Sequence, residues 1–187
     1  MVSLTQLWLP ILLSAVFVFI VSSILHMVIP IHKGDFRRVP GEEKVLAEMR
    51  NHGIQPGSYM FPFADSMKEC GSPEMLEKCK RGPVGFLTIT PSGAPGMGKS
   101  LVQWFLYSIL VAVLVAYIGT LGAVRGAAFM PVFRLAGTAA ILGYALGAFP
   151  DSIWKGTKWS ITGKFVFDGV LYGLVTGATF GWLWPAS

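Results

Sequence analysis

The chain has 187 residues, of which 53% are hydrophobic and only 13% are charged, whereas an ordinary soluble domain carries about 25% charged residues. A composition this apolar excludes a soluble fold of this size. The net charge of +5 does not indicate a nucleic-acid partner, because residues 32–100 hold ten Lys or Arg against eight Asp or Glu with the signs interleaved.

Outside that segment charge is scarce, and the first long hydrophobic run is Leu7–Ile31. A membrane-spanning helix needs about 20 mostly apolar residues, so this run is long enough. Its one ionisable residue is His26. No Lys or Arg precedes it, and it exceeds the roughly 7–15 apolar residues of a cleaved signal peptide. We therefore expect a retained transmembrane helix.

Three further hydrophobic runs follow at 101–124, 127–149 and 165–184. The first of them has no charge, the second has Arg134 alone and the third has Asp168 alone. The sequence thus predicts an α-helical integral membrane protein with four transmembrane helices. Residues 1–31 form the first helix, 32–100 a water-facing α/β cap with a re-entry linker, and 101–187 a three-helix bundle.

The cap has its own secondary-structure signals. Proline, glycine and capping patterns predict helices over 40–50 and 73–82 and strands over 58–63 and 84–90. Ser72 suits the N-cap of the second helix, because Pro73 follows at the first helical position. A segment of about 70 residues rarely buries enough apolar surface for more than a few kcal/mol of folding stability. We therefore expect the cap to be stabilised by contact with the membrane or with a partner.

The linker spells Gly93-Ala-Pro-Gly-Met-Gly98-Lys99-Ser100, which fits the phosphate-binding pattern G-x-x-x-x-G-K-S. In nucleotide-binding domains that loop joins a parallel sheet to a soluble helix, and an acidic residue on another strand holds magnesium. Here the helix that follows is an apolar span, and little soluble chain is left to build the sheet. We therefore expect a chance match, with Lys99 at the headgroups and Ser100 capping the span, and no enzyme or cofactor.

Small residues recur every four positions along the last three spans, and such stripes let membrane helices approach closely. They comprise Ala112 and Ala116 in the second span, Gly143 and Gly147 in the third, and Gly169, Gly173, Gly177 and Gly181 in the fourth. We expect these stripes to close the bundle of one chain; the alternative is an oligomer interface or a pore. The first span lacks such a stripe, and we expect it to face lipid or another subunit.

Two cysteines, Cys70 and Cys79, lie in the cap, and their spacing matches no zinc pattern. We expect reduced structural thiols if the cap is cytoplasmic, and a disulfide becomes plausible if the topology is inverted. No metal site is predicted.

His26, His32 and Asp35 cluster at the exit of the first span. Ionisable groups inside a span are functional candidates because burying a charge is costly. No second ligand from another span is identifiable, so an interfacial histidine is expected in preference to a metal ligand or proton relay.

Arg134 and Asp168 lie toward opposite membrane faces and should not meet. Asp168 is expected close to Asp151 and Lys164, in a ring of interfacial ion pairs; the functional alternative is a polar mouth that admits an anion.

Lys and Arg concentrate in residues 32–100 and 150–164, so the positive-inside rule places both of these loops in the cytoplasm. Both termini are then outside, as in a multi-pass protein of a cell membrane, such as a bacterial inner membrane.

Two functions follow from these features. Small size, a thin cap and the lack of catalytic chemistry favour a non-catalytic accessory or scaffold subunit of a larger membrane complex. The glycine stripes and the charges near helix ends favour a small homo-oligomeric transporter or channel. The expected partners are the lipid bilayer and other membrane subunits or a second copy of the chain, with no nucleic acid.

Overall fold

The computed structural model describes residues 2–94 and 96–186. The chain divides into two compact units. The bundle unit consists of Met1–Asp35, Gly96–Ile153 and Thr157–Ser187, and the cap unit of Phe36–Pro95 and Trp154–Gly156. Each unit is described by itself.

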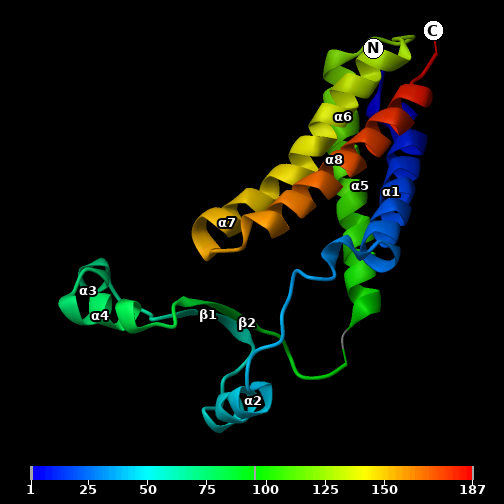
Figure 1. Ribbon diagram of the computed structural model, residues 1–187. Coiled ribbons are helices and arrows are strands. Elements are labelled where there is room, and N and C mark those ends of the chain that lie inside the picture. Colours follow the sequence, from blue (N-terminus) through cyan, green and yellow to red (C-terminus); the bar gives the residue numbers. More distant parts are fainter. Residues whose placement is uncertain (1, 95, 187) are drawn as a thin grey trace. The chain divides into compact units, whose positions relative to one another are not determined.

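The bundle unit is built from helices (Figure 1). Its elements are η1 (Leu4–Leu7), α1 (Trp8–Ser23), η2 (Ile24–Val28), η3 (Pro30–His32), α5 (Met97–Gly122), α6 (Phe129–Ala145), η4 (Leu146–Ala148), α7 (Phe149–Lys155) and α8 (Trp159–Trp182). Where these run on without a break they form long apolar helices, at Leu4–Val28, Met97–Gly122, Phe129–Lys155 and Trp159–Trp182.

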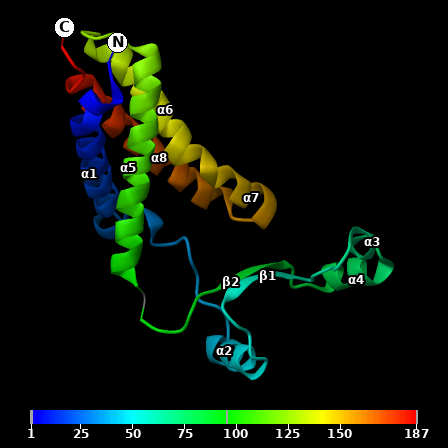
Figure 2. The ribbon, with the colours of Figure 1, turned by 180° about the vertical axis from the view of Figure 1, so that it is seen from behind.

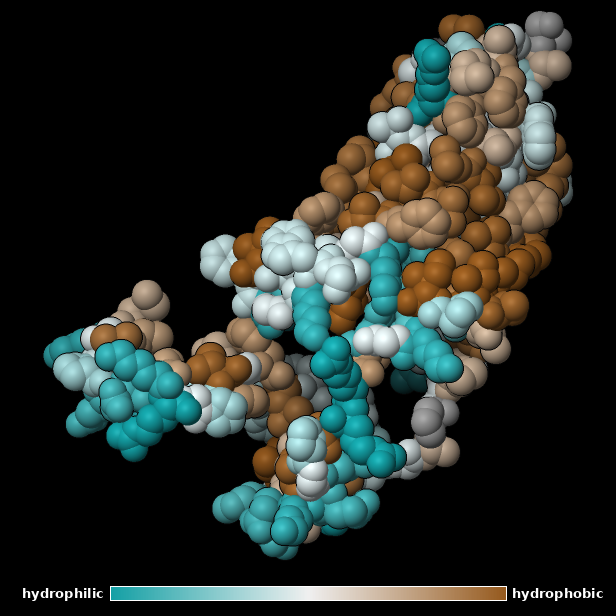
Figure 3. Space-filling view, viewed as in Figure 1, coloured by the Kyte–Doolittle hydropathy of each residue, from teal (hydrophilic) through white to brown (hydrophobic). Residues whose placement is uncertain are grey.

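The prediction of four helices long and apolar enough to cross a membrane is confirmed. Helices of 24 to 27 residues extend about 36–40 Å, which exceeds the roughly 30 Å of a bilayer's hydrocarbon core. Hydrophobic side chains gather on the outer surface of these helices, as expected where the solvent is lipid (Figure 3). The architecture is compatible with a multi-pass membrane protein.

α6 and α8 pack most closely, side by side in both views of the ribbon (Figures 1 and 2). The glycine stripe of α8 makes this approach possible. A Cβ built on Gly173 would lie 2.3 Å from Cγ1 of Ile141, and one on Gly177 would lie 2.7 Å from the carbonyl oxygen of Phe133. The stripe of α8 therefore lies against α6 of the same chain.

The stripes of the other two spans are used unequally. Ala112 and Ala116 of α5 are buried, and Gly143 of α6 faces α5, where an added Cβ would lie 3.2 Å from Val111. Gly147 has open space around its Cβ position, with no described heavy atom within 4 Å.

The first span does not simply face outward, contrary to expectation. Phe17 and Ile20 of α1 are exposed, but Ser14, Ala15 and Ser22 are buried on the face that packs against α5 and α8. The expectation failed because Ser14 and Ser22 are eight residues apart with Val18 between them, so this face shows no small residue at every fourth position. A serine hydroxyl bonds to a carbonyl of its own helix, as that of Ser22 does to Phe19, and the residue can then pack closely.

The two ends of the chain meet at one end of the bundle. Val2 and Leu7 share a buried cluster with Phe180 and Trp184, and the N–H of Gly126 donates to the carbonyl of Pro185 over 2.9 Å. The opposite end of the bundle therefore holds the exit of α1, the start of α5 and the start of α8.

The cap unit contains α2 (Glu42–Asn51), β1 (Gly57–Phe61), α3 (Met67–Cys70), α4 (Pro73–Arg81) and β2 (Gly85–Ile89). The two expected strands form a small antiparallel sheet with Tyr59 opposite Leu87. Ser72 caps α4 by accepting a hydrogen bond from the N–H of Met75 over 3.2 Å. α3 is an additional helix that the sequence patterns did not indicate.

Candidate functional site

The first span ends in two irregular turns that carry both histidines of the bundle unit. At Ile24 the helix widens into the π-helical turn η2, in which the N–H of Ile29 donates to the carbonyl of Ile24 over 3.0 Å. Pro30 has no backbone N–H, so the chain changes course into the 3₁₀ turn η3. The rings of His26 and His32 consequently stack, with centroids 4.3 Å apart.

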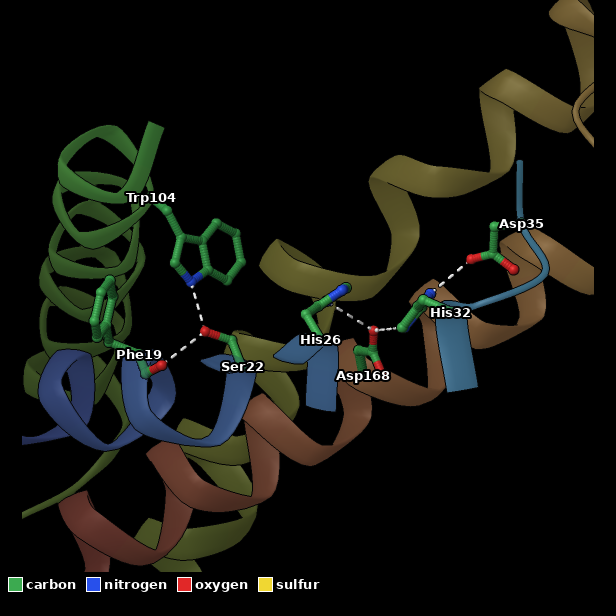
Figure 4. Close-up of polar contacts among 7 residues, drawn as sticks. All are labelled: Phe19, Ser22, His26, His32, Asp35, Trp104 and Asp168. Carbon is green, nitrogen blue, oxygen red and sulfur yellow. Dashed lines mark hydrogen bonds and ion pairs between the residues drawn. The ribbon is translucent and has the colours of Figure 1, made fainter. Parts of the chain in front are cut away.

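Asp168, in the first half of α8, lies against both histidine rings (Figure 4). Its carboxylate oxygen Oδ2 is 2.8 Å from Nε2 of His32 and 3.4 Å from Nε2 of His26. The residue is only 1% exposed, so its carboxyl group is held away from water within a helix long and apolar enough to cross a membrane. A carboxylate there costs several kcal/mol, which the hydrogen bond with His32 partly offsets.

A second carboxylate, that of Asp35, holds the far side of the His32 ring. Nδ1 of His32 is 2.7 Å from Oδ2 of Asp35, and the Lys164 ammonium donates to Oδ1 of the same group. The bond from Lys164 lowers the pKa of Asp35 below its usual range; the bond from His32 adds to this effect and burial opposes it. Both ring nitrogens of His32 thus face a carboxylate oxygen, Nδ1 that of Asp35 and Nε2 that of Asp168.

These five side chains, His26, His32, Asp35, Lys164 and Asp168, are called the polar network below. The ammonium of Lys164 pairs with one of its two carboxylates, and the histidine rings lie against the other. The pairing differs from the expected ring, in which Lys164 would neighbour Asp168 one turn further along α8. Because η3 packs on α8, it brings Asp35 within reach of Lys164, and the histidines take the place beside Asp168.

A cavity of about 510 Å³ opens beside the polar network and is lined from α1, η2, α5, α6, η4, α7 and α8. His26, Asp151 and Asp168 contribute its ionisable groups, and Trp104, Tyr144 and Tyr172 form an aromatic wall. The indole N–H of Trp104 donates to Oγ of Ser22 over 2.8 Å, which ties this wall to α1 (Figure 4).

Two buried polar atoms at the cavity have no hydrogen-bond partner among the described residues: Oδ1 of Asp168 and the hydroxyl of Tyr172. Buried polar atoms in native proteins are nearly always paired with protein or with ordered water. Both residues line the cavity. The unpaired atoms therefore mark a place where a bound species completes the hydrogen bonding.

The remaining candidates lie elsewhere. Gly98, Lys99 and Ser100 belong to the first turns of α5, which begins at Met97. The strand before them, β2, pairs antiparallel with β1, whereas a phosphate loop leaves a strand of a parallel sheet. Cys70 and Cys79 of the cap unit are exposed free thiols.

Sequence reasoning singled out each member of the polar network without grouping His26 and His32 with Asp168. A signal for the grouping existed, because the exit of the first span and the entry of the fourth lie on the same predicted side of the membrane. Comparison of the chain with models of protein families, with curated proteins and with solved structures finds no match in any of the three.

Proposed function

We propose that this chain binds a small cation inside the membrane and conducts it across, as a small transporter or channel. The observation that carries the proposal is the state of Asp168. Its carboxylate is buried in a spanning helix, its oxygen Oδ1 is unpaired among the described residues, and it lines a cavity of about 510 Å³. An unpaired buried acceptor costs free energy. A cation in the cavity supplies the missing partner and the opposite charge.

The walls of the cavity favour a cation over the anion considered from the sequence alone. Asp151 and Asp168 both line it, and two carboxylates repel an anion. The aromatic wall adds to this preference, because the faces of Trp104, Tyr144 and Tyr172 carry partial negative charge.

Buried hydroxyl groups continue from the cavity into the bundle. Ser108 of α5 and Thr176 of α8 are 0% and 1% exposed, and each lies one helical turn beyond a cavity-lining aromatic residue, Trp104 and Tyr172 respectively. Each hydroxyl donates to the carbonyl of that aromatic residue, which leaves its oxygen lone pairs available. Oxygen atoms of this kind are suitable partners for a cation that leaves the cavity.

The proposal is tested on the purified full chain in detergent. Thermal unfolding, followed by tryptophan fluorescence, is measured against a panel of monovalent, divalent and organic ammonium cations. At least one cation should raise the melting temperature of the wild type and not that of Asp168→Asn. Asp65→Asn, the same chemical change at an exposed position of the cap unit, should respond like the wild type. Flux of the active cation into proteoliposomes then tests transport.

If no cation in the panel stabilises the wild type, the proposed function is wrong. It is equally wrong if Asp168→Asn responds like the wild type, because the stabilisation then arises elsewhere. Binding without flux would leave a membrane-embedded cation-binding protein and would reject transport.

A second candidate function, the accessory or scaffold subunit, is favoured by one feature of the cap unit. Met75 is the one buried residue among the described residues of this unit, while Phe36, Phe63 and Met67 are 92%, 64% and 88% exposed. A partner that covers these side chains would supply the apolar burial that this unit lacks. Mild-detergent affinity purification with native mass measurement distinguishes the two: stoichiometric foreign subunits support the scaffold, and their absence argues against it.

A further inference from the structure

Three side chains of the polar network present potential metal ligands to one point. One ring nitrogen of His26, one of His32 and a carboxylate oxygen of Asp168 all lie within 4.8 Å of one another. We propose that these residues bind a divalent transition-metal ion of the Zn²⁺ type. This inference rests on the proposed cation-binding function and names the class of ion.

The spacing of the carboxylate oxygen from each histidine nitrogen is close to that of a tetrahedral site. Zn²⁺ binds imidazole nitrogen and carboxylate oxygen at about 2.0–2.2 Å, which places neighbouring ligands about 3.3 Å apart. The His26–Asp168 separation is 3.4 Å, and the His32–Asp168 separation is 2.8 Å. Insertion of the ion therefore requires the second pair to open by about half an ångström. It also requires the stacked rings of His26 and His32, now 18° from parallel, to turn so that a nitrogen of each faces the ion.

The donor set narrows the choice of ion. Two imidazoles and one carboxylate suit Zn²⁺, Co²⁺, Fe²⁺, Ni²⁺ and Mn²⁺, whereas Mg²⁺ and Ca²⁺ prefer sites made of oxygen alone. The set contains no thiolate or thioether, the soft ligands that select monovalent copper.

Asp35 acts as a positioning residue for the His32 ligand. It accepts a hydrogen bond from Nδ1 of His32, and Nε2 binds the ion after the proton that it shares with Asp168 is released to water. A carboxylate behind a metal-binding histidine is a common second contact of zinc sites. Asp35 is itself held by Lys164, so the pair adds no net charge beside the ion.

The site keeps an open position. Three protein ligands leave the fourth corner of a tetrahedron free, as in catalytic and transport sites and unlike closed structural ones. The cavity lies beside Asp168 and His26, and Oδ1 of Asp168 has no partner among the described residues. Water, or the second carboxylate oxygen of Asp168, can occupy the open position.

The test is a metal titration of the full chain, purified through a tag without histidine and stripped with a chelator. Co²⁺ serves as a probe, because its visible absorption bands report tetrahedral nitrogen and oxygen ligation directly. We expect one Co²⁺ per chain with those bands, displaced by Zn²⁺. Isothermal titration calorimetry gives the affinity for Zn²⁺.

Variants locate the ion. His26→Gln, His32→Gln and Asp168→Asn each remove one ligand and should abolish the Co²⁺ bands. Asp35→Asn should weaken Zn²⁺ binding by 10- to 100-fold while keeping the bands, as expected for a positioning residue. His52→Gln is the matched control, because His52 is the remaining histidine of the chain and is exposed in the cap unit.

The outcomes separate this inference from the proposed function. If His52→Gln loses the bands and the ligand variants keep them, the ion lies in the cap unit and the inference is wrong. If no transition metal binds while another cation still stabilises the wild type and not Asp168→Asn, the metal assignment fails and the cation site stands. If neither is observed, both fail.

Discussion

Nε2 of His32 and Oδ2 of Asp168 are 2.8 Å apart, although 136 residues of chain separate them. The contact joins the turn after the first span to the fourth span, at a point where Asp168 is withdrawn from water. His32 stabilises the carboxylate of Asp168, because a buried carboxylate without a partner costs free energy. The contact therefore stabilises the fold and is also part of the proposed site.

The His32–Asp168 contact should be energetically coupled. We expect His32→Gln and Asp168→Asn each to destabilise the protein, and the double variant to lose less than the two losses combined. Contacting residues in one network show coupling energies of about 0.5–3 kcal/mol. Reversible unfolding by SDS in mixed micelles, followed by tryptophan fluorescence, gives the four stabilities of the cycle. Additive losses would show that the two residues do not interact.

The fold was predictable because its signals are local and strong. Runs of 20 or more apolar residues indicated the four long helices, and Ser72 with Pro73 indicated the start of α4. The small sheet was equally predictable, because its two strands lie between clear turn residues.

The site was only partly predictable, since its geometry depends on irregular turns. The π-helical turn at Ile24–Val28 has no distinct sequence pattern, yet it stacks His26 on His32. Proline at position 30 signals an end to the helix without giving the direction of the chain beyond it. The pairing of His32 with Asp168, and of Lys164 with Asp35, depends on that direction.

The glycine stripe of α8 should tolerate no added methyl group where it faces backbone. In Gly177→Ala the new Cβ would lie 2.7 Å from the carbonyl oxygen of Phe133 and 3.0 Å from Cα of Gly137. Overpacking of this kind costs about 1–3 kcal/mol, because the helix backbone cannot move aside as a side chain can. Thermal unfolding in detergent should show a lower melting temperature.

Gly163→Ala is the matched control on the same helix, because no described heavy atom lies within 4 Å of its Cβ position. Alanine has the higher helix propensity, so this variant should be at least as stable as the wild type. Equal losses in the two variants would mean that glycine at 177 is not needed for packing against α6.

Stability should depend on Asp35 in a defined range of pH. The folded-state pKa of Asp35 lies below the usual carboxyl range, chiefly because of the bond from Lys164. A lowered carboxyl pKa stabilises the fold above the unfolded-state value, and this contribution disappears as the pH falls through the folded-state value. The wild type should therefore melt above Asp35→Asn at about pH 5, and the difference should shrink toward about pH 3.

Tryptophan fluorescence suits this measurement, because the chain has six tryptophans. A thiol-reactive dye would not report unfolding, because both cysteines are already exposed in the folded state. Lys164→Met removes the main cause of the lowered pKa and should reduce the same pH dependence. A difference between wild type and Asp35→Asn that stays constant down to about pH 3 would contradict the assignment of the bond from Lys164.

The orientation of the chain can be tested with its own cysteines. Cys70 and Cys79 are exposed free thiols of the cap unit, and the Lys and Arg bias predicts that this unit is cytoplasmic. In intact cells that express the protein, a membrane-impermeant maleimide should leave both unmodified and should label them once the cells are permeabilised. A cysteine placed at exposed Ala128, between α5 and α6 in a chain lacking the native pair, should be labelled in intact cells.

The reverse pattern would place the cap unit and the exit of α1 outside. A cation would then reach the cavity beside Asp168 from the outer face of the membrane, because that cavity is lined by the exit of α1 and the starts of α5 and α8.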